Sequence, residues 1–259
     1  MSEVLVITSG KGGVGKTTTT ANLGVALALA GRSVALVDAD IGLRNLDLAL
    51  GLENDIAYDV LDVVSGACGL RQALIRDRRW GTLWLLPAAQ HRDKASLTPE
   101  QMQGILAKLR EDFDYVLVDC PAGIEQGFRN AIAGADRAII VTVPEVTAVR
   151  DGLRVKTLLD ECALPVAGMV LTRFRPKMAR RGEILDIDDA VAIIGADLLG
   201  VIPEDEDVVR AGNYGEPLAA GNTPAAKAYK LLAQRLQGSE PPQQKGLSAL
   251  FKGLFGRAG

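Results

Sequence analysis

Short hydrophobic runs alternate along this chain with longer stretches in which apolar residues recur every three or four positions. Most of the runs span four to eight nearly continuously apolar residues and end in Asp, Pro or Gly. Strands that are buried on both faces have this pattern, and parallel sheets bury both faces. The runs are EVLVITSG (3–10), SVALVDAD (33–40), TLWLLPA (82–88), YVLVDCPAG (115–123), RAIIVTVPE (137–145), PVAGMVLTRF (165–174) and LLGVIPED (198–205).

Amphipathic stretches of helix length lie between most of the runs. The alternation of strand and helix predicts the α/β class, with a doubly wound, mostly parallel sheet flanked by helices on both sides. We expect one folded domain over residues 1–237, a flexible linker at 238–244 (GSEPPQQ) and a separate segment at 245–259. The predicted helices cover residues 15–30, 98–111, 146–162, 187–195 and 224–237.

The composition narrows the classes of function. Of 259 residues, 48% are hydrophobic and 24% are charged, which is typical of a folded globular chain. The formal net charge of −3 gives no electrostatic reason to expect nucleic acid as a specific partner. Cys68, Cys120 and Cys162 are widely spaced, which predicts reduced thiols of a cytoplasmic protein and neither a disulfide framework nor a zinc site. The single histidine, His91, lies in a polar run and is expected at the surface.

A glycine-rich loop follows the first predicted strand directly. Residues 10–17, GKGGVGKT, fit the pattern G-x-x-x-x-G-K-[ST] in the strand–loop–helix context that it requires. Successive backbone N–H groups of such a loop surround phosphate oxygens, and the helix that follows adds its positive dipole end. Lys16 is expected to reach the β- and γ-phosphates of ATP, and the Thr17 hydroxyl to ligate Mg²⁺. The candidate nucleotide-binding residues here are Gly10, Lys11, Gly12, Gly13, Val14, Gly15, Lys16, Thr17 and Thr18.

Lys11 is a second lysine inside the same loop. Two lysines and a helix dipole repel one another unless an anion lies between them. The run KGGVGKT (11–17) resembles the deviant Walker A motif of the MinD/ParA family of P-loop ATPases. The resemblance implies that Lys11 reaches across a two-fold interface and stabilises charge on the nucleotide of the partner subunit, as an arginine finger does. The alternative is a solvated loop lysine.

Three aspartates follow predicted strands, at the edge where ligands of open α/β sheets bind. In VDADIGLRNLD, the resemblance makes Asp40 the residue that orients the attacking water and Asp38 a support of the Mg²⁺ region. Asp119, at the end of YVLVD, stands where a Walker B carboxylate holds Mg²⁺, through water. A helix cap or turn residue is the alternative for each aspartate taken alone.

The order of several further motifs resembles the MinD branch of the family, which comprises ATPases that position bacterial division. These motifs are DIGLRNLD, PAAQHRDK, DCPAGIE, VPEVTAVRD and LGVIPED, and they extend over nearly the whole chain. Two departures, Cys120 and Val143, do not touch the phosphate chemistry. VLTRF and VIPED resemble the adenine-contacting loops of the family and implicate Thr172, Arg173 and Pro203.

The C-terminal segment GLSALFKGLFGRAG carries five large apolar residues at helical spacing. They fall within an arc of roughly 140° at 100° per residue, with Lys245 and Lys252 opposite, which is the pattern of a helix lying in a membrane interface. The alternative is a helix packed on its own domain, which Gly246, Gly253 and the Pro-Pro linker disfavour. The candidate membrane-binding residues are Leu247, Leu250, Phe251, Lys252, Leu254 and Phe255.

Together these features predict a dimerising Mg²⁺-dependent ATPase that binds anionic membrane reversibly from the cytoplasm and positions the division site. The resemblance implies MinC as a recruited division inhibitor and MinE as an activator of hydrolysis. Arg44, Asn45 and Asp151 are the expected partner-binding residues. Three alternatives are a flagellar-number-regulating ATPase, a ParA-like DNA-partitioning ATPase and an iron–sulfur ATPase, of which the last needs two suitably placed cysteines per subunit.

Overall fold

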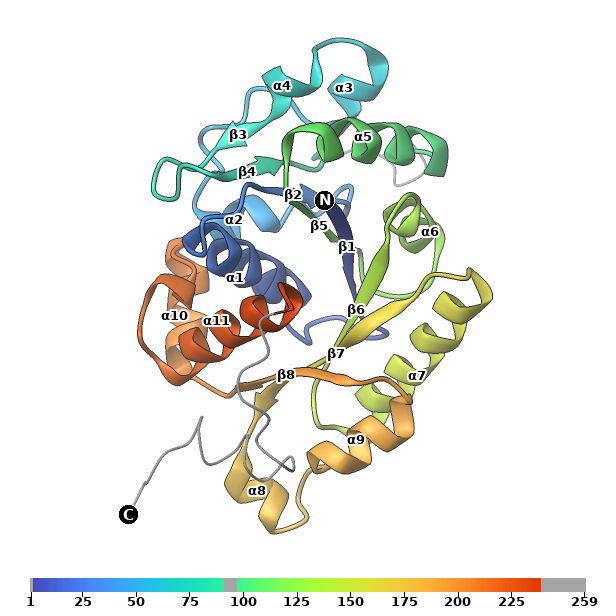
Figure 1. The fold of residues 1–259 in the computed structure, drawn as a ribbon, viewed down its shortest axis with the longest axis vertical. Coiled ribbons are helices and arrows are strands. Elements are labelled where there is room, and N and C mark those ends of the chain that lie inside the picture. The colour runs from blue at the N-terminus through green and yellow to red at the C-terminus, as the bar shows by residue number, and fades with distance from the viewer. Residues whose placement is uncertain (1, 91–96, 239–259) are drawn as a thin grey trace.

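The computed structural model describes residues 2–90 and 97–238. Within this part of the chain, eight strands form one sheet in the order β3-β4-β2-β5-β1-β6-β7-β8 (Figure 1). All neighbouring pairs are parallel except β3 and β4, which are antiparallel. The strands are β1 (Glu3–Thr8), β2 (Val34–Asp38), β3 (Ile75–Arg76), β4 (Leu83–Leu86), β5 (Tyr115–Asp119), β6 (Arg137–Thr142), β7 (Val166–Phe174) and β8 (Leu198–Pro203).

Helices cover both faces of the sheet (Figure 1), which confirms the doubly wound architecture. One buried hydrophobic cluster includes residues of α5, α6, α7 and α9, and a second, across the sheet, includes residues of α1, α2 and α11. The helices are α1 (Lys16–Leu29), α2 (Leu46–Leu50), α3 (Val60–Ser65), α4 (Leu70–Ala73), α5 (Pro99–Asp112), α6 (Gln126–Ile132), α7 (Val146–Glu161), α8 (Pro176–Arg180), α9 (Ile187–Ile194), α10 (Glu206–Tyr214), the 3-10 turn η2 (Leu218–Ala220) and α11 (Pro224–Leu236).

Strand β1 shows why the hydrophobic runs are continuous. Its side chains alternate between the two clusters: Val4 and Val6 belong to one, Leu5 and Ile7 to the other, and all four are fully buried. Burial of each such side chain contributes about 1.5–3 kcal/mol relative to exposure. A polar residue at any of these four positions would lose that contribution, and the polar residues of the strand, Glu3 and Thr8, stand at its two ends.

The structure adds elements that the hydrophobic pattern did not predict. Strand β3 has two residues and pairs antiparallel at the edge of the sheet. The helices α2, α3, α4 and α8 have four to six residues each, which is too short for an apolar stripe to repeat. The five predicted helices correspond to α1, α5, α7, α9 and α11 within two residues at each end. Among the described residues no helix has the length and hydrophobicity to cross a membrane.

Candidate nucleotide-binding site

The predicted site residues follow the carboxyl ends of parallel strands and therefore lie at one edge of the sheet. The glycine-rich loop leaves β1, which lies between β5 and β6 at the point where the strand order reverses. Asp38 ends β2, Asp119 ends β5 and Pro203 ends β8. Ligands of open α/β sheets bind outside such a reversal point. The fold therefore brings together loops that are up to about 190 residues apart in sequence.

Two glycines give the loop its curvature. Gly13 and Gly15 have φ angles of 75° and 93°, in the left-handed region that side chains disfavour. A Cβ at Gly13 would meet nothing within 4 Å, so its conformation and not crowding requires glycine. Gly15 directly precedes α1 and has no side chain to cap the first N–H groups of that helix. These groups form the anion-binding end of a helix dipole, as a phosphate site requires.

Gly10 serves a different purpose, because the loop passes very close to α7. A Cβ on Gly10 would lie 2.3 Å from the carbonyl oxygen of Asp151, whereas one on Gly12 would lie 3.8 Å from Ala122 Cβ. A second contact fixes the other side of the loop, where the Thr172 hydroxyl donates to the Val14 carbonyl oxygen at 2.7 Å. The loop is thus held between α7 and β7.

Asp38 and Asp119 are register partners on adjacent strands and are almost completely buried. Burial raises the pKa of the Asp38 carboxyl, and the charge of Asp119 raises it further. Burial also raises the pKa of Asp119, while hydrogen bonds from Thr17 and Thr20 and the charge of Lys16 act in the opposite direction. The Thr20 hydroxyl lies 3.2 Å from a carboxylate oxygen of Asp119. Two buried carboxyls with adjacent hydroxyls offer the hard oxygen ligands that Mg²⁺ prefers.

Asp38 also shapes the loop that follows it. Its oxygens accept hydrogen bonds from the backbone N–H groups of Asp40, Asn45 and Leu46, at 2.9, 3.2 and 3.1 Å. The carboxylate thus folds the loop and starts α2. The charge of Asp40 raises the pKa of both Asp38 and Asp119, which places all three carboxyls in one neighbourhood.

These carboxyls do not form a closed metal cage. Within the described residues no group of three or more His, Cys, Asp or Glu side chains is arranged to hold a metal ion. A Mg²⁺ ion at a phosphate-transfer site usually takes only one or two carboxylates and completes its shell with phosphates and water. The residues that fit it are Thr17 and Asp119, with Asp38 beside them.

The two lysines of the loop have different environments. Lys16 is 9% exposed and its charge lowers the pKa of Asp119. The side chain of Lys11 is 46% exposed, and its ammonium forms an ion pair with Glu145, whose side chain is 58% exposed, at 3.2 Å. Lys16 is therefore built into the site, whereas Lys11 lies at its rim on a pair that water can open.

Comparisons with known proteins agree with this geometry. A family model described as the CobQ/CobB/MinD/ParA nucleotide binding domain matches residues 5–218. The septum site-determining protein MinD of Bacillus subtilis (strain 168) is 49% identical over 265 aligned positions, which cover 99% of each chain. The chain belongs to the MinD family.

Two solved structures of MinD proteins are similar in fold as well. In the MinC:MinD cell division protein complex of Aquifex aeolicus, the matching chain has a TM-score of 0.87 and 44% identity, covering 94% of this chain and 99% of that one. The MinD protein of Pyrococcus horikoshii OT3, complexed with Mg-ADP, gives a TM-score of 0.83 at 32% identity and covers 91% and 96%. The chain is therefore an ATPase of the MinD family that acts in placing the division site, as predicted, and not one of the three alternatives.

The base-contacting residues predicted from the MinD family lie at two adjacent strand ends. Thr172 is buried and its hydroxyl faces the phosphate loop, so its visible role is to support Val14. Arg173 is exposed and has a left-handed φ of 51°, an unusual conformation that non-glycine residues keep mainly at functional positions. Phe174, the next residue, is in register with Pro203. Arg173 and Pro203 thus border the same edge, and their contact with a base stays a prediction.

The residues expected to bind partners lie on two elements. Arg44 has a φ of 47°, and its half-buried guanidinium pairs with the buried carboxylate of Asp47 at 2.9 Å. Asn45 precedes α2, and Asp151 lies on α7, where it pairs with Arg154 at 3.0 Å. A partner that bound Arg44 through its charge would have to replace Asp47. These assignments stay predictions.

Sequence reasoning missed three residues of the site, Thr20, Asp47 and Glu145. Thr20 and Glu145 give no motif of their own, although Glu145 lies in the VPEV run. The sequence gives no sign that Asp47 is buried, and only the structure shows its burial in α2. Cys120, which the sequence analysis noted as a departure from the family motif, lies beside Lys16 and Asp119, and burial raises the pKa of its thiol to about 12.

The remaining predictions lie outside the described residues. They concern His91, most of the linker at 238–244 and the whole segment at 245–259, including the membrane-binding residues.

Proposed function

We propose that this protein is a Mg²⁺-dependent ATPase whose ATP-bound form dimerises, binds anionic membrane and marks sites where division is blocked. The observation that carries the proposal is the pair of lysines in one phosphate loop. Lys16 is buried beside Asp119, whereas Lys11 is exposed on an ion pair with Glu145. An exposed lysine at the rim of the site, such as Lys11, can stabilise a second anion only if that anion comes from outside the chain.

Each residue of the site has a separate part in hydrolysis. Lys16 and the N–H groups that precede α1 bind the β- and γ-phosphates, while Thr17 and Asp119 would hold Mg²⁺. The ion, when bound, neutralises charge between the phosphates. Asp40 orients the attacking water, and Asp38 keeps the Asp40 loop in place through three backbone hydrogen bonds. Replacement of Asp40 should therefore slow hydrolysis without preventing ATP binding.

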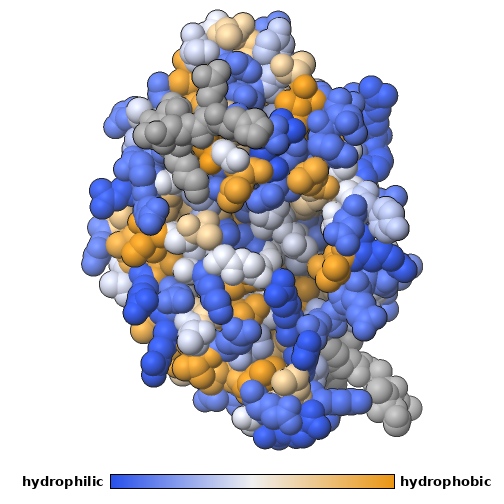
Figure 2. Space-filling model, turned by 180° about the vertical axis from the view of Figure 1, so that it is seen from behind, coloured by the Kyte–Doolittle hydropathy of each residue, from blue (hydrophilic) through white to orange (hydrophobic). Residues whose placement is uncertain are grey.

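Dimerisation would exchange one ion pair for another. In the single chain Lys11 binds Glu145, an exposed pair that contributes about 0.2–1 kcal/mol. Transfer of the ammonium to the γ-phosphate of a facing subunit gains a more buried, more highly charged partner. Exposed apolar residues at this edge, Leu43 and Ile124 on loops and Val146 at the start of α7, would provide surface for such a contact. On the face opposite to that of Figure 1, hydrophobic patches are separate and lie between hydrophilic side chains (Figure 2).

Membrane binding would follow from dimerisation through the C-terminal segment. Five Leu and Phe side chains could gain on the order of 7–15 kcal/mol if fully buried. Burial in an interface is partial, and ordering some ten residues costs about 1 kcal/mol or more apiece. One segment therefore binds marginally, and two on one dimer gain roughly a hundredfold or more from effective concentration. Hydrolysis would return the protein to the cytoplasm.

The partners would be a MinC-like inhibitor and a MinE-like activator. The Aquifex aeolicus structure is a complex of MinC with a MinD chain that is 44% identical to this one. Arg44, Asn45 and Asp151 are the first positions to test for partner contacts, because they lie on the Asp40 loop and on α7, both next to the phosphate loop.

Sedimentation with vesicles that contain phosphatidylglycerol tests the proposal. The full chain and a chain ending at residue 238 would be compared with ATP, with ADP and without nucleotide. We expect only the full chain with ATP to sediment, and Asp40→Ala to increase the bound fraction because hydrolysis no longer releases it. Phe251→Glu should abolish sedimentation, whereas the matched control Phe251→Leu should retain most of it. Equal sedimentation with ATP and ADP would refute the nucleotide-controlled membrane switch.

A further inference from the structure

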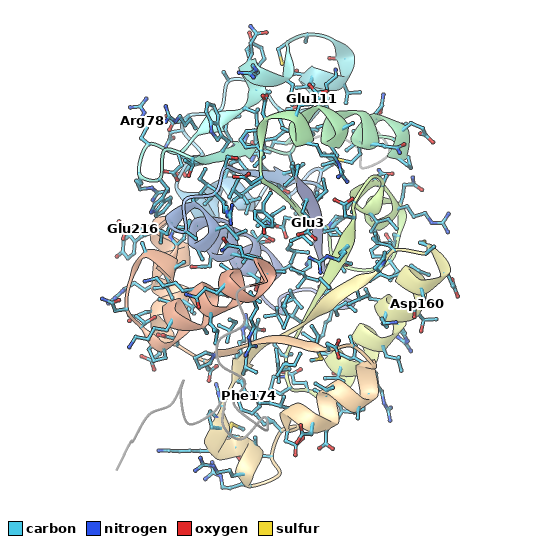
Figure 3. All side chains as sticks on the ribbon, in the orientation of Figure 1. Glu3, Arg78, Glu111, Asp160, Phe174 and Glu216 are labelled. Atoms are coloured by element: carbon cyan, nitrogen blue, oxygen red, sulfur yellow. The ribbon has the colours of Figure 1, made fainter. Side chains whose placement is uncertain are left out.

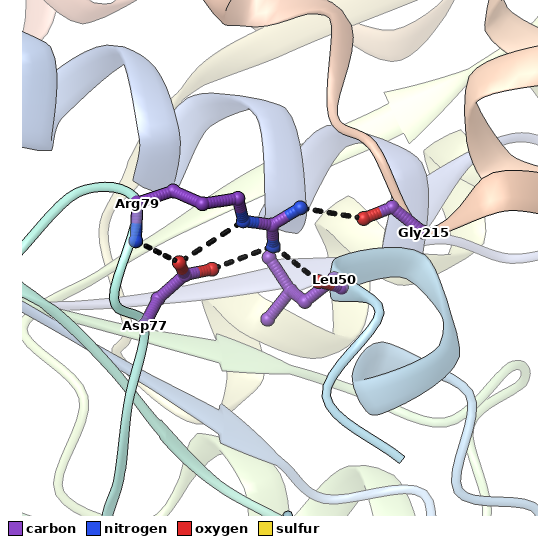
Figure 4. A network of polar contacts seen from close by, with 4 residues as sticks. All are labelled: Leu50, Asp77, Arg79 and Gly215. Atoms are coloured by element: carbon purple, nitrogen blue, oxygen red, sulfur yellow. Dashed lines mark hydrogen bonds and ion pairs between the residues drawn. The ribbon is translucent and has the colours of Figure 1, made fainter. Parts of the chain in front are cut away.

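Arg79, in the loop between β3 and β4, joins three segments that are distant in sequence (Figure 4). Its guanidinium donates to the carbonyl oxygen of Gly215 at 2.9 Å and to that of Leu50 at short distance. It also donates to both carboxylate oxygens of Asp77, at 3.1 and 2.7 Å. Asp77 is 1% exposed, so its charge depends on this partner. One side chain thus connects the β3–β4 loop to the ends of α2 and α10.

The ends of α2 and α10 are in direct backbone contact at the same place. Gly51 ends α2 with a φ of 64°, and Gly215 ends α10 with a φ of 63°. A Cβ on Gly215 would lie 2.3 Å from Gly51 Cα, and one on Gly51 would lie 2.9 Å from the Gly215 carbonyl oxygen. Glycine at both positions allows the two backbones to approach within reach of one guanidinium.

Each of these helices begins at the nucleotide site. Helix α2 follows the Asp40 loop, and the Asp38 carboxylate accepts the N–H groups of Asn45 and Leu46 at its start. Helix α10 begins three residues after Pro203, the predicted base-contacting position at the end of β8. The two helices therefore diverge from two loops of one site and meet again at Arg79.

Apart from half-buried Val208, which packs against the hydrophobic cluster that includes α1, α2 and α11, helix α10 has little apolar support. None of its nine residues, all of which the structure describes, is buried. A cavity of about 350 Å³, lined by Arg79, Trp80, Arg210 and Tyr214 among others, lies between part of α10 and the β3–β4 loop. The apolar core therefore holds α10 mainly through Val208 near its start, and the polar bridge holds its far end.

We propose that Arg79 is a positioning residue that couples the Asp40 loop to the Pro203 loop by holding the far ends of α2 and α10 together. The coupling to nucleotide rests on the proposed nucleotide site, whereas the bridge itself does not. A lysine cannot replace this arginine, because only the planar guanidinium offers five N–H donors in fixed directions. The bridge needs donors for two carbonyl groups and one carboxylate at once.

Amide hydrogen exchange of the nucleotide-free full chain tests the bridge. The variant is Arg79→Lys, and the matched control is Arg78→Lys, because Arg78 is exposed and points away from the domain (Figure 3). We expect Arg79→Lys to raise exchange rates in residues 46–52 and 206–216 by about tenfold or more. Arg78→Lys should change neither segment. Faster exchange confined to residues 75–83, or none, would overturn the proposal.

A second variant guards against unfolding, since Arg79→Lys leaves the buried Asp77 poorly paired. The double variant Asp77→Asn with Arg79→Gln removes both charges and the bridge together. It should show the same faster exchange in residues 46–52 and 206–216. If the double variant is folded and both segments exchange at wild-type rates, the bridge does not position the helices.

Trp80 offers a readout of the coupling, because the Arg79 guanidinium lies over its ring, 4.3 Å from the centroid. The other tryptophan, Trp84, would be removed by Trp84→Phe. We expect Mg-ADP to change Trp80 emission in this background, and Arg79→Lys to abolish that change while binding, measured by calorimetry, persists. An equal emission change with Arg79→Lys would overturn the coupling. Absence of nucleotide binding by the wild-type chain would instead contradict the proposed function and leave the exchange result valid.

Discussion

The contact between the phosphate loop and α7 makes a quantitative prediction for Gly10→Ala. The new Cβ would lie 2.3 Å from the carbonyl oxygen of Asp151, 2.4 Å from its carbonyl carbon and 2.6 Å from its Cβ. Ordinary contacts begin about 1 Å farther away, so the loop or the helix must move. Two of the three atoms belong to the backbone of α7, which is fixed by helical hydrogen bonds and by buried Val149. Such overpacking typically costs about 1–3 kcal/mol.

This cost translates into a melting temperature that a simple experiment can measure. For a domain of this size, 1 kcal/mol shifts the midpoint by about 2–4 °C, so Gly10→Ala should melt about 2–12 °C below the wild type. Nucleotide at 100 times its Kd stabilises a protein by about 2.7 kcal/mol. Most of that stabilisation should disappear in Gly10→Ala, because the phosphate loop is displaced. Circular dichroism melts with and without Mg-ADP give both values.

Gly12→Ala is the matched control for the same loop. Its Cβ would lie 3.8 Å from Ala122 Cβ, an ordinary contact, and Gly12 does not have a left-handed φ. The nucleotide-free control should therefore melt within about 2 °C of the wild type, or slightly above it. If Gly10→Ala melts with the wild type, or if both variants lose equal stability, the steric reasoning is wrong.

Three further predictions concern charges and thiols of the site. Lys11→Ala should retain monomeric nucleotide binding and lose ATP-dependent dimers in light scattering, whereas Glu145→Gln should strengthen them by no more than about fivefold per subunit, because an exposed pair contributes little. With a chromogenic disulfide reagent, exposed Cys162 should react at once, and Cys120, whose pKa burial raises to about 12, only on opening of the site. In Cys162→Ser, fast reaction of both remaining thiols, half-buried Cys68 and buried Cys120, would contradict the buried position of Cys120. The raised pKa values of the two buried carboxyls that end β2 and β5 mean that the folded state retains protons that the unfolded chain has released, so the stability of the nucleotide-free protein should fall from about pH 5 to 8. A urea titration series would detect this, and Mg-ADP should reduce the slope; a rise over this range would contradict it.

The fold could be predicted from the sequence because each parallel strand is buried on both faces. Runs such as residues 3–8 can satisfy that environment only when nearly every position is apolar. The phosphate loop could be predicted because its chemistry fixes residue types at fixed spacing. The Arg79 bridge could not, because no pattern in Asp77 and Arg79 reveals that two helix ends, at Gly51 and Gly215, will meet beside them. Every residue has a backbone carbonyl group, so the sequence does not show which of these groups will accept a hydrogen bond from a distant side chain.

The different exposure of the two loop lysines fits the proposal that one motif both binds a nucleotide and responds to a second subunit. Lys16 is buried and meets Asp119, so its charge is committed whether or not a second subunit is present. Lys11 is half-exposed on an ion pair of about 0.2–1 kcal/mol, which thermal motion opens readily. A stronger internal pair would keep Lys11 from a facing phosphate, and an unpaired Lys11 would repel Lys16 in the nucleotide-free chain. A weak, exposed partner such as Glu145 avoids both outcomes, and the proposed dimerisation would then depend on whether the facing site contains a γ-phosphate.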